Sequence, residues 1–147
     1  SALDAHLPVL ASNAIQPAVR ARAYRALLDG KMVWLEGRKW EWIDIRYCKG
    51  QLKAVHGERP LAIEAPLATT LKAAASDRSA LVRSVAGAVL IREAQRLGPI
   101  ALQLAGIFAA DKSPPLSARG NFLLKSLTQT SGELQDLAPP TLNTNAP

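Results

Sequence analysis

One pattern recurs three times along this chain: a short polar turn, and then a helix-like segment that opens on a hydrophobic residue followed by arginine. The steps are Val19-Arg20, Val82-Arg83 and Ala118-Arg119, and aliphatic residues follow each at helical spacing. Self-similarity of this kind is typical of stacked helical units, in which each unit buries its apolar face against the next. The pattern therefore predicts an all-α fold, a short α-solenoid of about three two-helix repeats. Such arrays are scaffolds that bind other molecules and seldom carry out chemistry.

Apolar periodicity and turn residues place the individual helices. Pro17 suits the first turn of one helix, and Gly30 suits a left-handed cap at its end. Gly98 and Pro99 repeat that stop and start between two later helices, and Pro66 delays the start of another. The expected helices span residues 2–13, 17–29, 61–75, 80–97, 99–110 and 116–129.

Residues 31–60 depart from the helical pattern, and they contain all three tryptophans of the chain. Apolar and charged residues alternate over 43–47, and a period of two indicates extended structure. A turn at residues 36–38 would join a strand over 32–35 to a second strand over 39–47. We therefore expect a Trp-rich extended or hairpin-like insertion after the first repeat, with an irregular long loop as the alternative.

In its helical segments the chain resembles HEAT-type, armadillo-like repeat proteins. Each unit of that family is a pair of antiparallel helices, and a turn with an aspartate precedes a second helix that opens with Val-Arg and continues with alanine and leucine. Val82-Arg83, Ala86 and Leu90 after Asp77 match this motif well. The resemblance implies a helical array that binds partners.

The other two units depart from the family pattern. Asn13 or Gln16 stands where the first unit would have aspartate, and Phe122 stands in the alanine place of the third. In the family, the turn aspartate and the helix arginine often bond between neighbouring units. The resemblance therefore implies structural roles for Arg20, Asp77, Arg83, Asp111 and Arg119.

A domain organisation follows from these patterns. Residues 1–129 are expected to form one HEAT-like repeat domain, with 31–60 as an aromatic and basic insertion. Residues 130–147 contain proline, threonine and asparagine, and we expect a C-terminal tail with little regular structure. Because the chain begins at Ser1 rather than methionine, a domain cut from a larger assembly is a further interpretation.

Composition bounds the class of protein and its partners. A chain of 147 residues with 48% apolar residues is long and apolar enough for a core. The formal net charge of +6 favours acidic partners, although it also serves solubility. The single cysteine, Cys48, allows no internal disulfide and favours a reducing, cytoplasmic compartment. No apolar run reaches the roughly 18 residues of a membrane span.

The sequence lacks the usual signatures of catalysis. It has no phosphate-binding glycine loop, no nucleophile elbow and no His-Glu-x-x-His motif. Two histidines and one cysteine fall short of the four ligands of a structural zinc site. We therefore expect no enzyme, no metal and no cofactor.

The insertion is the best candidate for a binding site. It carries seven basic and four acidic residues, a net charge of +3, interleaved with aromatic residues. Such a surface can plug a protein pocket or stack on bases, unless the tryptophans only pack onto the helices. We predict a non-enzymatic scaffold that binds a protein through its helical concave face or this insertion, with nucleic-acid binding through the basic surface as the alternative. The candidate binding residues are Trp34, Arg38, Lys39, Trp40, Trp42, Arg46 and Tyr47.

Overall fold

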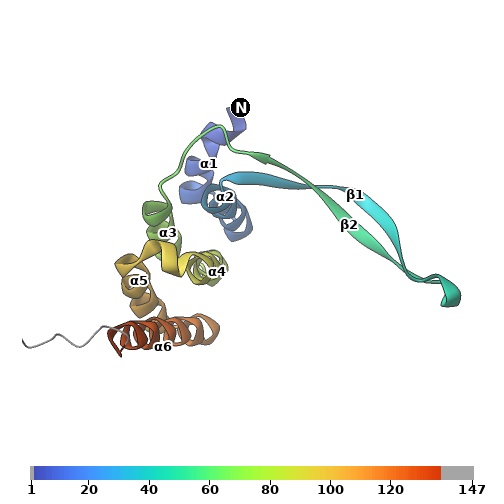
Figure 1. Ribbon diagram of the computed structural model, residues 1–147. Coiled ribbons are helices and arrows are strands. Elements are labelled where there is room, and N and C mark those ends of the chain that lie inside the picture. The colour runs from blue at the N-terminus through green and yellow to red at the C-terminus, as the bar shows by residue number, and fades with distance from the viewer. Residues whose placement is uncertain (1, 137–147) are drawn as a thin grey trace, which may run out of the picture. The chain divides into compact units, whose positions relative to one another are not determined.

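The computed structural model describes residues 2–136, with side chains described up to Thr130 (Figure 1). In chain order the elements are α1 (Ala2–Asn13), α2 (Pro17–Asp29), β1 (Lys31–Asp44), the short 3-10 helix η1 (Ile45–Tyr47), β2 (Lys49–Pro60), α3 (Leu67–Ala75), α4 (Ala80–Leu97), α5 (Pro99–Ala109) and α6 (Pro114–Asp136).

The prediction of an all-α, armadillo-like solenoid is wrong. Strands β1 and β2 pair into an antiparallel two-stranded sheet, so the fold mixes helices with a long β-hairpin (Figure 1). The recurring Arg/Ala/Leu pattern marks the buried face of single helices, as at Val82, Ala86 and Leu90, and it carries no information about the segment between them. A helical array is therefore not the right description of this chain.

The hairpin is longer than the sequence suggested, and its turn lies elsewhere. Cross-strand pairing runs from Lys31 opposite Pro60 to Asp44 opposite Lys49. The expected turn at residues 36–38 lies inside β1, where the pairing shifts by one residue between Leu35 and Gly37. A bulge of this kind needs the same small and polar residues as a turn, which explains the error.

The true turn is the 3-10 helix η1. The Asp44 carboxylate accepts a hydrogen bond from the Arg46 backbone N–H at 3.0 Å. Cys48 closes the turn in the left-handed region, with φ of 51°. Alternation over residues 43–47 therefore spans the end of a strand and a turn.

Most helix boundaries expected from the sequence agree with the structure within two residues, but the helix expected over 61–75 begins only at Leu67, after Pro66. Pro17 begins α2, and Gly30 ends it with φ of 69° while its N–H donates to the Ala26 carbonyl. Gly98, with φ of 59°, separates α4 from Pro99 at the start of α5. Helix α6 continues past the expected end at residue 129 to Asp136, and the rest of the predicted tail lies outside the described residues.

The described residues divide into two compact units, with the boundary between Ala86 and Gly87 inside α4. The predicted single domain over 1–129 covers the first unit and most of the second. Each unit has its own buried apolar residues. In the first these include Leu7, Tyr24, Leu27, Leu28, Leu71 and Val82; in the second they include Leu90, Leu104, Phe108, Leu116 and Leu123.

A buried ion pair holds the helices of the first unit together. Arg20 of α2, which is 1% exposed, donates from Nε and Nη2 to the two carboxylate oxygens of Asp77, at 3.0 and 3.1 Å. Its Nη1 also donates to the carbonyls of Ala14 and Ile15 in the loop before α2. Asp77 lies in the turn before α4, so one side chain joins two helix connections.

Asp77 has partners on both sides of its turn. Its carboxylate accepts the Ser79 N–H at 2.8 Å, and its carbonyl accepts Arg83 Nη1 at 3.0 Å. Burial raises the pKa of Asp77, but the hydrogen bonds from Arg20 and Ser79 and the charge of Arg20 outweigh it, so the pKa is lowered overall. Among the residues predicted to be structural, Arg20, Asp77 and Arg83 therefore form one network.

The remaining two predicted structural residues lie in the second unit. The Asp111 carboxylate accepts the Ser113 N–H at 2.8 Å in the turn before α6. Arg119 follows on α6, where its side chain lies near Gly87. Gly120 is the point at which α6 meets α5, because a Cβ there would overlap backbone atoms of Phe108 and Ala109.

Candidate functional site

The hairpin is fixed to the helices at its base. Asp4 of α1 is fully buried, and Arg59 of β2 donates to its two carboxylate oxygens at 2.7 and 2.9 Å. The Ala62 N–H donates to the same carboxylate at 2.9 Å. The Leu61 N–H donates to the Gly30 carbonyl at 2.9 Å, which closes the neck of the hairpin. The strands beyond this neck run away from α1 and α2 (Figure 1).

The ion pair between Asp4 and Arg59 is expected to make the stability of the protein depend on pH. The hydrogen bonds from Arg59 and from the Ala62 N–H hold the pKa of Asp4 well below its usual range. As the pH falls, Asp4 of the unfolded chain, with a pKa of about 3.9, therefore takes up a proton at a higher pH than Asp4 of the folded chain does. Stability from the anchor is complete above that value, and it is lost as pH falls below about 4 toward the folded pKa.

Urea denaturation at a series of pH values tests this. The wild-type free energy of unfolding is expected to fall as the pH drops below about 4, and Asp4→Asn, already less stable at neutral pH, is expected to show a shallower fall. Asp77, whose pKa is also lowered, leaves a residual slope in both proteins. Parallel curves for the two proteins would show that Asp4 is not the titrating anchor.

The register sorts the distal hairpin into two faces, because directly paired residues point to the same side of a sheet. We call one the aromatic face. It consists of Arg38, Trp40 and Trp42 of β1 and their partners Ala54, Leu52 and Gly50 of β2. We call the other the charged face. It consists of Lys39, Glu41 and Asp44 of β1 and their partners Lys53, Gln51 and Lys49 of β2.

The two tryptophans of the aromatic face are held in place yet remain accessible. Their rings lie 5.5 Å apart at 84°, an edge-to-face arrangement. The indole of Trp40 lies over Gly50, where any Cβ would overlap it. Trp40 is nevertheless 46% exposed and Trp42 53% exposed, and neighbouring Leu52 is 60% exposed. The missing side chain of Gly50 thus leaves space for the indole of Trp40, which is held in one orientation and remains exposed to solvent.

Trp34 belongs to a different part of the hairpin. It is paired with Gly57, so it lies on the same side of β2 as the charged face and closer to the helices. A Cβ on Gly57 would overlap its indole and the carboxylate of Glu36. The structure thus brings together Trp40 and Trp42 but separates both from Trp34.

The tip adds a further exposed apolar group. Ile43, Ile45 and Tyr47 are all more than half exposed, around the turn that η1 makes. Arg46 is also at the tip, 3.5 Å from the Asp44 carboxylate and largely exposed. Together with the aromatic face these residues form what we call the distal arm, residues 38–54. The alternative that the tryptophans pack onto the helices does not fit their place in the hairpin.

The cations of the distal arm differ in whether they form ion pairs with its acidic groups. Lys53 pairs with Glu41 at 3.5 Å on the charged face. Arg38, Lys39 and Lys49 have no ion pair with any of the residues that the structure describes. Of these three, Arg38 lies on the aromatic face with Trp40 and Trp42, whereas Lys39 and Lys49 lie on the charged face.

Sequence reasoning missed the contribution of β2. The strands expected from the sequence end at residue 47, whereas Gly50 and Leu52 of β2 complete the aromatic face. The signal that was available is the alternation of small or apolar residues at 50, 52 and 54 with polar residues at 51 and 53.

Two absences bear on the kind of site. Among the side chains described, up to Thr130, no cluster of histidine, cysteine, aspartate and glutamate is suitable for a metal ion. Over residues 2–136 no helix combines the length and the apolar character needed to cross a membrane. No protein-family model, curated protein or solved structure matches this chain.

Proposed function

We propose that this chain is a non-enzymatic protein-interaction module that binds a partner protein through the distal arm. One observation carries this proposal: Trp40, Trp42 and Leu52 are held on one face of a paired ribbon and stay about half exposed. Exposed apolar patches of this kind, bordered by charge, mark interaction surfaces on proteins. We do not propose binding through a concave helical face, because the fold is not the all-α solenoid that would form such a face.

The residue types of the arm favour a protein partner over other partners. Tryptophan, tyrosine and arginine dominate the energetics of protein interfaces, and Trp40, Trp42, Tyr47 and Arg38 are all on the arm. The exposed isoleucines at the tip favour an apolar pocket, which a protein provides and a phosphate backbone does not. The net charge of +3 over residues 31–60 favours acidic residues around that pocket.

A photoreactive amino acid placed in the arm tests this. One variant carries the photoreactive residue at Trp42 on the aromatic face, and a matched control carries it at Gln51 on the charged face. Cross-linking in cells, followed by purification of the captured protein, then allows direct titration of the two pure proteins. We expect one discrete adduct from position 42 and a measurable dissociation constant.

The dissociation constants of arm variants for the captured partner show whether the arm carries the interaction. Trp40→Ala and Trp42→Ala are each expected to weaken binding by roughly 30-fold or more, as for interface residues worth about 2 kcal/mol. Gln51→Ala should change the dissociation constant less than twofold. Equal capture from both positions, or full affinity in both tryptophan variants, would show that the arm does not carry the interaction. An adduct that is only a second copy of the chain would identify self-association instead.

Nucleic-acid binding is a second candidate. It is favoured by three cations that form no ion pair among the described residues: Arg38 on the aromatic face, and Lys39 and Lys49 on the charged face. Bases stack on aromatic rings while cations contact the phosphates. Titration of labelled single- and double-stranded oligonucleotides at two salt concentrations tests it. Affinity that falls steeply with salt, and less steeply in Lys39→Gln, supports this function. No binding at about 50 mM salt excludes it.

The absence of catalysis and the cytoplasmic compartment remain proposals. Cys48 is a free, exposed cysteine at the end of η1, which fits a reducing compartment.

A further inference from the structure

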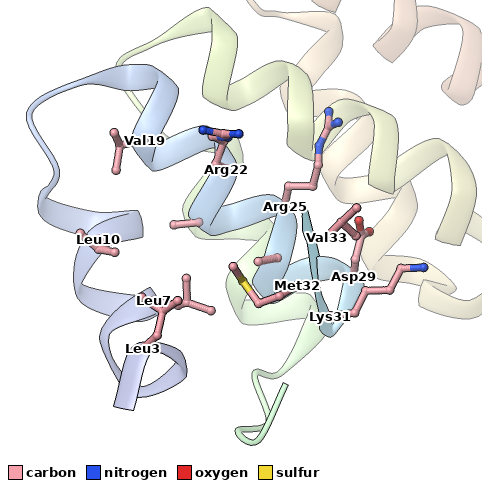
Figure 2. A pocket seen from close by; sticks show the side chains of 12 residues that line it. Leu3, Leu7, Leu10, Val19, Arg22, Arg25, Asp29, Lys31, Met32 and Val33 are labelled. Carbon is pink, nitrogen blue, oxygen red and sulfur yellow. The ribbon is translucent and has the colours of Figure 1, made fainter. Parts of the chain in front are cut away.

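A second surface of the first unit lies apart from the distal arm. A cavity of about 430 Å³ opens between α1, α2 and the start of β1 (Figure 2). Leu3, Leu7 and Leu10 lie along α1 on one side of it, and Arg22 and Arg25 lie along α2 on the other. The volume is in the range of small-molecule sites, about 300–1,000 Å³.

The interior of the cavity is apolar. Leu7 of α1 and Ala23 and Ala26 of α2 are buried there, and the short alanine side chains leave room between the two helices. Val19 and Leu3 remain partly exposed at its borders, so the apolar surface reaches solvent. An apolar chain entering the cavity would cover this surface and displace water from it.

The border on the α2 side is cationic. Arg22 and Arg25 are three residues apart on one helix, which places them on the same face. Both are exposed, and neither has an ion pair with another residue in the part of the chain that the structure describes. Their positive charge at this border therefore remains available to a bound group.

The end of the cavity next to β1 has a different balance. Asp29 lies there, and Lys31 Nζ is 2.7 Å from the Glu58 carboxylate. A bound anion is therefore expected at Arg22 and Arg25 rather than at this end.

From these observations we propose that the cavity binds a free amphipathic carboxylate, an acid with an unbranched apolar chain. The chain lies against Leu7, Ala23 and Ala26, and the carboxylate is held by Arg22 and Arg25. Guanidinium groups bind carboxylates through paired N–H donors, which gives the site its preference for this head group.

Isothermal titration of the full chain with three probes tests each part of the proposal. Dodecanoate, below its micelle concentration, carries both the chain and the carboxylate. Dodecanol carries the chain alone, and butyrate carries the carboxylate with too short a chain. We expect saturable binding of one dodecanoate per chain, and at least tenfold weaker binding of each of the other two probes.

Two double variants test the arginines at equal change of charge. Arg22→Gln/Arg25→Gln should weaken dodecanoate binding at least tenfold, because both side chains are exposed and the fold does not depend on them. Arg46→Gln/Lys49→Gln removes two positive charges from the distal arm, outside the cavity, and should leave the affinity unchanged.

Several results would overturn the proposal. These are no saturable binding of dodecanoate, equal binding of dodecanol, or unchanged affinity in Arg22→Gln/Arg25→Gln. Binding to vesicles that contain anionic lipid, without binding of monomeric dodecanoate, would also overturn it and would indicate a membrane surface. None of these results depends on the distal arm, so the two proposals can fail separately.

Discussion

Replacement of Arg20 by methionine is expected to destabilise the first unit more than any other single replacement of one of its polar residues. Methionine keeps most of the apolar stem but removes the guanidinium. Asp77 then keeps its charge in a buried place without its main partner, and removal of one partner from a buried pair is far more harmful than removal of both. The carbonyls of Ala14 and Ile15 lose their donor at the same time.

A double variant separates the charge from the packing. Asp77→Asn keeps an oxygen for the Ser79 N–H and removes the unpaired charge. Arg20→Met/Asp77→Asn is therefore expected to be more stable than Arg20→Met alone, although less stable than the wild type. Thermal unfolding followed by far-UV circular dichroism gives the comparison. A double variant that unfolds below Arg20→Met would show that the ion pair is not what links the two helix connections.

Replacement of Gly120 by alanine is expected to destabilise the second unit, because α5 and α6 meet there at backbone level. The added methyl group would overlap backbone atoms of Phe108 and Ala109, which cannot move aside as a flexible side chain can. Overpacking of this kind costs about 1–3 kcal/mol when neighbours can adjust, and we expect the upper part of that range or more.

Gly106→Ala is the matched control on α5. A Cβ at Gly106 meets nothing within 4 Å, and the residue is exposed in the last turn of α5. The same substitution there should stabilise the protein by about 0.5–1 kcal/mol, because alanine loses less backbone entropy than glycine. Urea denaturation of both variants gives opposite signs if the close approach of α5 and α6 is real. A Gly120→Ala protein as stable as Gly106→Ala would contradict it.

The helices could be predicted well because their limits depend on local chemistry. Pro17, Gly30, Gly98 and Pro99 act through their own backbone restrictions, so their effect can be read from a few neighbouring residues. The start of α3 after Pro66 follows from the same restriction.

The hairpin could be predicted only in part because its register depends on residues far apart in the sequence. Alternation indicated extended structure, but the partner of Trp40 is Leu52 and the partner of Trp34 is Gly57. Gly37 looked like a turn residue although it follows a bulge within β1. The separation of Trp34 from Trp40 and Trp42 follows from this register, and sequence spacing alone does not reveal it.

Similar limits apply to the anchor and the cavity. Asp4 is buried and its partner Arg59 is partly exposed; α2 and most of the hairpin lie between them in the sequence, and neither residue has a local signature. The cavity depends on the distance between α1 and α2. Ala23 and Ala26 influence this distance, but it cannot be predicted from their presence in the sequence.

The solvent accessibility of the tryptophans tests the binding role of the distal arm, because all three lie in the hairpin and tryptophan fluorescence, excited selectively at long wavelength, therefore reports on the hairpin alone. A protein that keeps only Trp42, with phenylalanine at positions 34 and 40, is titrated with acrylamide before and after it binds the partner captured from that position. We expect efficient quenching in the free protein and strong protection in the complex. A Trp42 that is already protected in the free protein, or equally quenched in the complex, would contradict the claim that the distal arm is the binding surface.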